Sequence, residues 1–434
     1  MRRFNSGRKH DLFRRVCVTV LTAMGAGLLL APAQVQASEV SCQDLYVPVS
    51  VLGTPQTMYG KLCAPVGANT VQVLVPGGTY NSTYWDISYT PTIRSFRLAM
   101  NNAGYATLAV DRLGTGNSSK PPSVLLTAST QAGALHQVIQ TLRAGTLGPR
   151  FDKVILGGHS LGSAISMIEA GTFHDVDGVL ITGITHRIKL LNVGSVLANT
   201  TPAALDPQFA GRVPDPGYIT TRPGTRYSAF HRPGPDIPGA TAYDESTKDV
   251  SAVSEVVDTL LLTSVVIPYS RRIDVPVLLV VGDDPIVCGP PLGSDCSSAE
   301  ALRQSEAPFY PPAAGLQTYV LHGYGHSINY APNAPDYHQV VVQWADRTVG
   351  SSANCASSLA GDACPPTVAT TTRQPVSDRP FPNGRCQQSG PLRQKAVRTF
   401  RRRARPALGG LTSLALGQSP YQDRARQSTI DTLQ

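Results

Sequence analysis

The sequence predicts an α/β protein built on a mostly parallel sheet with helices on both faces. Two observations predict this class. Short, continuous apolar runs alternate with segments that carry apolar residues at helical spacing, as expected for strands buried on both faces. Hydrophobic residues make up 41% of the 434 residues and charged residues 15%, so a large core can be buried. This composition argues against a collagen, a coiled coil, a polytopic membrane protein and a wholly disordered chain.

The first elements show the alternation clearly. Residues 71–75 form a β-branched run that ends at the Pro-Gly-Gly turn 76–78. We expect a helix over 92–103, which ends at Gly104, and a second strand over 105–110.

The later elements repeat the pattern. Helical spacing over 130–145 precedes a strand at 154–156, which ends at two glycines, and a helix over 161–170 follows. The remaining expected elements are strands at 179–181, 277–281 and 319–321 and a closing helix over 336–347.

Residues 183–270 break this rhythm. They are rich in proline, with helical stretches near 187–198 and 247–262, and about 88 residues are too many for a plain crossover. We predict an inserted cap over the carboxyl edge of the sheet, where open α/β sheets bind ligands. Its apolar side chains form an acyl or alcohol pocket, or they pack the cap on the body. They are Leu190, Leu191, Val193, Val196, Leu197, Leu260, Leu261 and Leu262.

A Gly-x-Ser-x-Gly motif, residues 158–162, lies directly after a predicted strand and directly before a predicted helix. The glycines permit a tight strand–turn–helix bend, and the helix N-terminus favours developing negative charge. We predict that Ser160 is a nucleophile, and that the adjacent His159 packs locally.

A serine hydroxyl needs a base, and the bend predicts the chain order serine, acid, histidine. His326 follows the last strand in a Gly-rich loop and is the expected general base, with His322 as the rival. Asp284 is the preferred orienting acid, because it lies further past the strand than the alternative acid, Asp283.

An oxyanion needs two backbone N–H donors. One is expected from Leu161, the residue after the nucleophile. The other is expected from the loop after the strand 71–75, at Gly78 or Thr79.

Three segments carry a resemblance to a known family. They are Pro76-Gly77-Gly78-Thr79-Tyr80-Asn81-Ser82-Thr83-Tyr84-Trp85-Asp86, the stretch from Gly104-Tyr105-Ala106-Thr107 through Asp111-Arg112-Leu113-Gly114-Thr115-Gly116-Asn117-Ser118-Ser119, and Gly158-His159-Ser160-Leu161-Gly162. Over roughly residues 42–350, the chain resembles the secreted α/β-hydrolase fold proteins of bacteria and fungi.

The resemblance implies a reaction class but no particular substrate. It implies an eight-stranded sheet, a cap and the triad Ser160, Asp284 and His326. Many members have His-Gly where this chain has Pro76-Gly77, and the acid turn here is one residue shorter than is common, which keeps Asp283 open.

The N-terminus has the pattern of a secretory signal peptide. A basic stretch precedes an apolar run over 16–31, and Val35-Gln36-Ala37 is a small-x-small cleavage pattern. We expect residues 1–37 to be removed after Ala37 and the protein to be secreted; the alternative is an uncleaved single-span anchor. The hydrolase domain is then 38–350.

The basic charge is concentrated at the two ends of the chain. The net charge of +8 divides into about +5 in residues 1–37, about +9 in 373–434 and about −6 between them. A mildly acidic body argues against a nucleic-acid partner. We predict that 351–434 is a Pro/Ser/Thr/Arg-rich disordered tail, whose basic cluster can also contact an anionic cell surface.

Export makes disulfides possible. Pairing of nearest neighbours predicts Cys42–Cys63, which would bridge an antiparallel hairpin over 46–65, together with Cys288–Cys296 and Cys355–Cys364. Cys386 is left over. The cysteines lack the spacing of a metal site, so we expect no metal.

These residues predict a secreted serine hydrolase, monomeric by default, that cleaves small-molecule carboxylic esters without a cofactor. Three alternatives stay open. The same triad serves amidases or aminopeptidases, for which Asp244 and Glu245 are candidate ligands of a substrate amine. It also serves acyltransferases. A catalytically silent binding protein on the same scaffold is the third.

Overall fold

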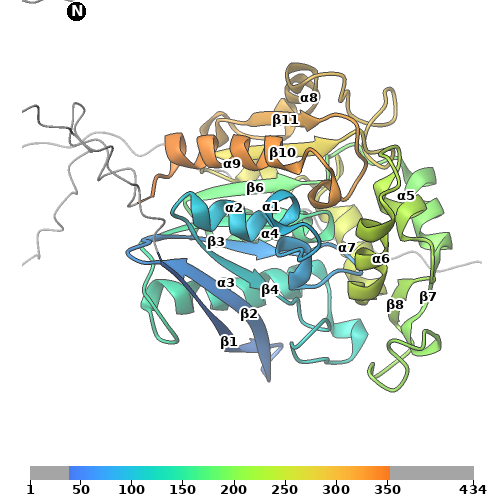
Figure 1. Ribbon diagram of the computed structural model, residues 1–434, viewed down its shortest axis with the longest axis horizontal. Helices are drawn as coiled ribbons and strands as arrows, with labels where there is room; N and C mark the ends of the chain where they lie inside the picture. The colour runs from blue at the N-terminus through green and yellow to red at the C-terminus, as the bar shows by residue number, and fades with distance from the viewer. Residues whose placement is uncertain (1–38, 352–434) are drawn as a thin grey trace, which may run out of the picture. The chain divides into compact units, whose positions relative to one another are not determined.

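A computed structural model describes residues 39–351 (Figure 1). The predicted signal peptide, the predicted tail after residue 351, the Cys355–Cys364 pair and Cys386 lie outside the described residues.

The core is an eight-stranded sheet in the order β1-β2-β4-β3-β5-β6-β10-β11. β1 and β2 form an antiparallel hairpin, β2 also pairs antiparallel with β4, and the other neighbours are parallel. The predicted mostly parallel, eight-stranded sheet is confirmed. Its strands are β1 (Val40–Val51), β2 (Thr54–Pro65), β3 (Thr70–Val75), β4 (Ala106–Val110), β5 (Lys153–His159), β6 (Gly178–Thr182), β10 (Val277–Gly282) and β11 (Gln317–Leu321).

Helices cover both faces of the sheet (Figure 1). On β3, Val71, Val73 and Val75 pack into the core on one side, while Leu74 packs into the core on the other. This alternation explains why the strands read as continuous apolar runs. The first core also holds α3 (Ala128–Ala144), α4 (Leu161–Phe173) and α8 (Ala299–Glu306). The second holds α2 (Phe96–Asn102) and α9 (Ala334–Thr348), and the short helix α1 (Pro91–Arg94) contacts both of these helices.

The insert between β6 and β10 holds three helices and a small sheet. Figure 1 shows α5, α6, β7 and β8 at one end of the main sheet. The three-stranded sheet β7-β8-β9 is antiparallel and has no counterpart among the predicted elements. The elements are α5 (Leu190–Ala198), β7 (Thr200–Pro202), β8 (Tyr218–Thr221), α6 (Pro238–Thr247), β9 (Ser251–Ala252) and α7 (Val253–Leu262).

Two predicted helices differ from the observed ones. The helix expected over 92–103 is divided at Ser95, whose side chain accepts a hydrogen bond from the Leu98 N–H at 3.0 Å and caps α2. The helix expected over 247–262 begins only at Val253, because residues 251–252 pair as β9.

Short helical turns connect the main elements. They are η1 (Ser82–Trp85), η2 (Ser123–Leu125), η3 (Ala203–Leu205), η4 (Tyr227–His231), η5 (Tyr269–Arg272), η6 (Ala307–Phe309), η7 (Pro312–Ala314) and η8 (Ile328–Tyr330).

Both predicted disulfides within the described residues form. Cys42 and Cys63 are register partners on β1 and β2, with S–S 2.04 Å, and Cys288–Cys296 closes a loop after β10 with S–S 2.01 Å. Between residues 39 and 351, no helix combines the length and apolar character that a membrane span requires.

Candidate active site

Ser160 lies in a sharp turn between β5 and α4. Its φ of 52° and ψ of −119° place a non-glycine residue in a strained backbone region. The Ser160 N–H donates to the Thr182 carbonyl on the neighbouring strand β6 at 2.8 Å, which anchors the turn. The predicted nucleophile therefore occupies a strand–turn–helix bend.

The two glycines of the motif are required by close backbone contacts. A Cβ on Gly158 would lie 2.4 Å from the Gly162 carbonyl oxygen, and one on Gly162 would lie 2.3 Å from the Val75 carbonyl oxygen. Real Cβ atoms do not approach backbone this closely, so β3, β5 and α4 meet only with glycine at both positions.

The structure brings His326 and Asp284 together. The His326 Nδ1 lies 2.6 Å from the Asp284 Oδ2, and both side chains are buried. The Asp284 Oδ1 also accepts the Ile286 N–H at 2.9 Å, so both carboxylate oxygens are engaged. This arrangement places the His326 Nδ1–H on Asp284 and leaves the Nε2 atom free of it.

The alternative residues form a separate pair at the surface. Asp283 contacts the His322 Nδ1 at 2.8 Å and accepts the Gly323 N–H at 2.7 Å. Within residues 39–351, neither Asp283 nor His322 has a hydrogen bond to His326.

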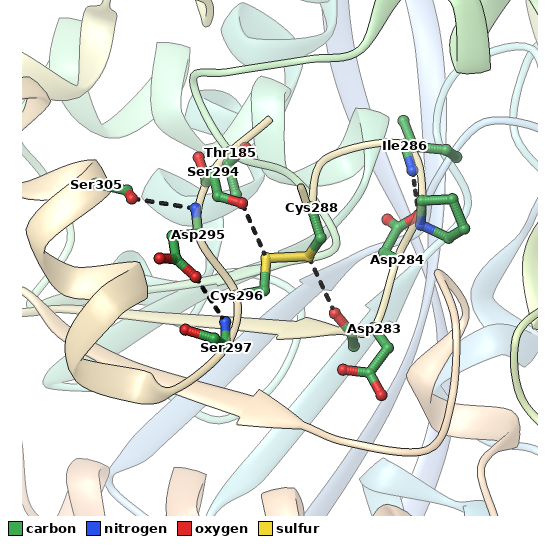
Figure 2. The surroundings of a disulfide bond; sticks show 12 residues. Thr185, Asp283, Asp284, Ile286, Cys288, Ser294, Asp295, Cys296, Ser297 and Ser305 are labelled. Atoms are coloured by element: carbon green, nitrogen blue, oxygen red, sulfur yellow. Dashed lines mark hydrogen bonds between the residues drawn. A yellow bond between two sulfur atoms is a disulfide. The ribbon is translucent and has the colours of Figure 1, made fainter. Parts of the chain in front are cut away.

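Figure 2 shows Asp284 in the segment that leads from β10 to Cys288, the first cysteine of the second disulfide. The N–H groups of Val287 and Cys288 donate to the Asp284 carbonyl at 3.2 and 2.8 Å. The Cys288–Cys296 bond joins this turn to the next segment, so it restrains the backbone that carries the acid.

His159 packs beneath the site. Its buried ring stacks on Tyr84 with 4.3 Å between the centroids, and its Nδ1 lies 3.1 Å from the Thr182 Oγ1. Burial, and then the nearby His326, hold the pKa of His159 well below its ordinary value. His159 therefore stays neutral beside His326.

The predicted nucleophile, base and oxyanion donors line one cavity of about 150 Å³. Ser160, His326, Leu161, Gly78 and Thr79 all line it, while Asp284 lies behind His326. Most of the remaining wall is aliphatic or aromatic. Its apolar members are Ile184, Ile188, Val193, Val196, Leu197, Ile219, Phe230, Val256, Leu260, Ile286 and Val287.

The insert supplies only part of the apolar set that the sequence suggested. Of the eight residues, Val193, Val196, Leu197 and Leu260 line the cavity. Leu190, Leu191 and Leu261 face solvent instead, and Leu262 packs against the main core.

The predicted oxyanion donors lie beside Ser160. A Cβ on Gly78 would be 3.7 Å from the Leu161 Cδ2, so the loop after β3 approaches the start of α4 closely. Among the described residues, the N–H groups of Gly78, Thr79 and Leu161 have no hydrogen-bond acceptor. Such free donors are what a developing oxyanion requires.

A buried ion pair holds Gly77 in this loop. Arg112 and Glu255 are both buried and form a salt bridge. The Arg112 Nη2 donates to the Gly77 carbonyl at 3.3 Å. Glu255 also accepts from the Ser251 hydroxyl at 3.0 Å, and Ser251 lines the cavity.

A second buried ion pair holds the loop two residues further on. The Arg226 guanidinium lies 2.7 Å from Asp244 and donates to the Thr79 carbonyl and hydroxyl at 3.2 and 2.8 Å. It also lies 4.0 Å from the centre of the Tyr80 ring. Burial alone would raise the pKa of Asp244, but Arg226, and next His231, lower it to about 2. The pair is therefore charged.

The same network reaches the loop of the general base. The Tyr80 hydroxyl lies 3.2 Å from the Asp244 Oδ2 and 2.7 Å from the hydroxyl of Ser327, the neighbour of His326. Asp244 thus connects the oxyanion loop with the histidine loop.

Sequence reasoning missed Arg112, Arg226 and Glu255, since no local pattern indicates that a charged side chain will be buried. It named Asp244 as a ligand for a substrate amine, yet Asp244 is paired and off the cavity wall. Glu245 forms a salt bridge with Lys248 at 2.8 Å and does not line the cavity either.

One cluster away from the cavity has the donor types of a metal site. His136, Glu169 and Asp175 offer ligand atoms within 4.8 Å of one another. The His136 Nδ1 already contacts the Asp175 Oδ2 at 2.8 Å. Burial, and next Asp175, raise the pKa of Glu169 to about 10, so a proton neutralises this carboxyl at pH 7.

The fold and the position of the cavity define an α/β-hydrolase. Residues 72–342 match the model of the alpha/beta hydrolase family. The chain therefore belongs to this family, and its general class is that of a hydrolase. No curated protein matches the sequence.

Several solved structures resemble the chain. A carboxyl esterase from Bacillus coagulans has 14% identity and a TM-score of 0.48, covering 71% of this chain and 99% of its own. A carboxylesterase from Bacillus subtilis has 15% identity and a TM-score of 0.47, with 70% and 91% covered. An alpha/beta hydrolase from a Penicillium species has 16% identity and a TM-score of 0.47, with 71% and 99% covered.

Proposed function

We propose that this protein is a serine hydrolase that cleaves carboxylic esters through an acyl-enzyme. The observation that carries the proposal is the meeting of the Ser160 turn with the His326–Asp284 pair at one apolar cavity. Each group has the chemistry that acyl transfer needs: a nucleophile, a base and an acid that orients the base.

The proposed reaction begins with attack of the Ser160 Oγ on the ester carbonyl. His326 takes the serine proton at Nε2, because its Nδ1–H is held by Asp284. The carbonyl oxygen becomes an oxyanion, which the N–H of Leu161 and that of Gly78 or Thr79 bind.

His326 then gives its proton to the leaving alcohol, and the acyl group stays on Ser160. Water attacks this acyl-enzyme with His326 again as the base, which releases the acid and restores the serine.

The cavity wall favours an uncharged acyl group. Among the residues that the structure describes, its lining contains no Asp, Glu, Lys or Arg. A substrate ammonium would enter this cavity without a partner, which is costly. This lining supports an ester with an apolar acyl chain over the aminopeptidase alternative, for which Asp244 and Glu245 are otherwise engaged.

We also propose that the protein is exported, with cleavage after Ala37. The Cys42–Cys63 and Cys288–Cys296 disulfides support an oxidising compartment. N-terminal sequencing of the protein from culture medium tests this proposal. A first residue of Ser38 is expected, and a protein retained in cells with its first 37 residues would contradict it.

Labelling with a fluorophosphonate probe tests the catalytic proposal. We expect covalent labelling of the wild-type protein, loss of labelling in Ser160→Ala, and turnover of p-nitrophenyl esters that depends on acyl length. Ser166→Ala is the matched control, because Ser166 lies in α4, the helix that follows Ser160, and its hydroxyl donates to the Gly162 carbonyl. Absence of labelling in folded wild-type protein would overturn the proposal and favour a silent binding scaffold.

A further inference from the structure

The outer faces of two insert helices are apolar and exposed. α5 contains no charged residue and no buried residue. Leu191 is 84% exposed and Leu197 40% exposed, and beyond α7 Val266 is 68% exposed. We name the exposed set the apolar rim; it consists of Leu190, Leu191, Leu197, Val257, Leu261 and Val266.

The same helices line the cavity with their inner faces. α5 contributes Val193 and Val196, and α7 contributes Val256 and Leu260. Leu197 belongs to both surfaces, since it lines the cavity and is also part of the rim. The cavity therefore reaches the molecular surface beside the rim, at Leu197.

This concentration differs from the scattered apolar residues that soluble proteins normally expose. Exposed apolar residues outside the rim, such as Leu52, Val66, Val124 and Leu292, come from separate turns and loops of the chain. Apolar surface gathered around a ligand cavity marks an interaction site.

We propose that the apolar rim rests on the surface of a lipid phase, from which the cavity draws its ester. The inference rests on the proposed esterase function and names its substrate class: a water-insoluble ester of an apolar acyl chain. Because Leu197 belongs to both the rim and the cavity wall, a protein or second copy bound tightly on the rim would obstruct the site. A lipid surface covers the rim and supplies the substrate.

The attraction is hydrophobic rather than electrostatic, because every rim residue is Leu or Val and α5 carries no charge. Binding is therefore expected on uncharged vesicles, where the basic residues of the C-terminal segment gain nothing. This property separates the rim from any electrostatic contact of the tail.

The test measures co-sedimentation of the full-length Ser160→Ala protein with phosphatidylcholine vesicles that contain trioleoylglycerol. The rim variant is Leu191→Ser/Val266→Ser. The matched control is Leu52→Ser/Val66→Ser, which removes two equally exposed apolar side chains, 79% and 75% exposed, far from the cavity. We expect the rim variant to bind about tenfold more weakly and the control to bind like the parent.

A parallel assay keeps this inference separate from the proposed function. With Ser160 intact, the rim variant is expected to hydrolyse dissolved p-nitrophenyl acetate within about twofold of wild type, and to lose about tenfold on the vesicle-bound ester. If the wild-type protein does not hydrolyse dissolved p-nitrophenyl acetate, the proposed esterase function is refuted.

Two results would overturn the proposal that the rim binds a lipid surface. One is equal sedimentation of the rim variant and the control, including no sedimentation of either. The other is a dimer seen by light scattering that the rim substitutions dissolve, which would assign the rim to a second copy of the chain.

Discussion

Arg226 has two separable effects at the residue scale. It neutralises the buried Asp244 and it holds Thr79, whose N–H is a candidate oxyanion donor. Arg226→Met is expected to lower kcat for p-nitrophenyl butyrate by about 10–100-fold with KM changed less than about threefold, because small displacements of donors weaken transition-state binding. It should also destabilise the fold by about 3–5 kcal/mol, since Asp244 is left without its guanidinium partner.

A double variant separates these two effects of Arg226. Arg226→Met/Asp244→Asn removes the unpaired charge, so the melting temperature should recover in part while kcat stays low. Recovery of kcat together with the melting temperature would mean that the pair only supports folding.

Glu169 gives the protein a pH-dependent stability. Burial, and next Asp175, raise its pKa from the ordinary 4.5 to about 10. Between these values the folded state keeps a proton that the unfolded state releases, so stability decreases as pH rises through this window. Among the described residues, neither carboxylate oxygen of Glu169 has a hydrogen-bond partner in the structure, so no donor stabilises the charged form of this side chain.

Glu169→Gln supplies a permanent donor in place of the proton. We expect its melting temperature to exceed that of wild type by about 3–6 °C at pH 8 and to equal it at pH 4. The surface variant Glu300→Gln is the control, because that side chain pairs with Arg303 in solvent. The same shift for Glu169→Gln at both pH values would contradict the retained proton.

At the scale of elements, the acid loop depends on its disulfide. Cys288→Ser/Cys296→Ser is expected to lower kcat about tenfold, because the turn that carries Asp284 gains freedom and the His326–Asp284 contact loosens. The matched variant Cys42→Ser/Cys63→Ser opens the β1–β2 hairpin away from the cavity. Both pairs should lose about 2–3 kcal/mol of stability, but only the first should lose kcat. Equal kcat in the two variants would contradict a positioning role for the loop.

The elements that the sequence predicted well are those buried on both sides. The predicted strands 71–75 and 277–281 correspond closely to β3 and β10. Their side chains are apolar on both faces, and such short runs are buried as central strands of the sheet. The secondary structure of the insert was predicted poorly, because it depends on contacts between residues that are distant in the sequence. β9 is two residues long and pairs only with β8, and no local pattern marks it.

The candidate site divides in the same way. The Ser160 turn could be predicted because close backbone contacts force glycine at 158 and 162, which leaves a motif. Asp284 was preferred over Asp283 because it lies further past the end of β10, and in the structure Asp284 is the carboxylate that contacts His326. Arg112 and Arg226 could not be predicted, because their partners Glu255 and Asp244 lie 143 and 18 residues away and only the folded insert brings them together.

At the scale of the whole molecule, charge and apolar surface lie on different parts of the chain. Residues 373–434 carry about +9, whereas 38–372 carry about −6 and include the rim. Removal of residues 365–434 is therefore expected to leave turnover of a dissolved ester within about twofold. It should abolish any salt-sensitive sedimentation with anionic vesicles, which screening by salt also removes. Sedimentation with uncharged vesicles should persist, because that attraction comes from the rim. Loss of turnover on truncation would show instead that the C-terminal segment belongs to the working enzyme.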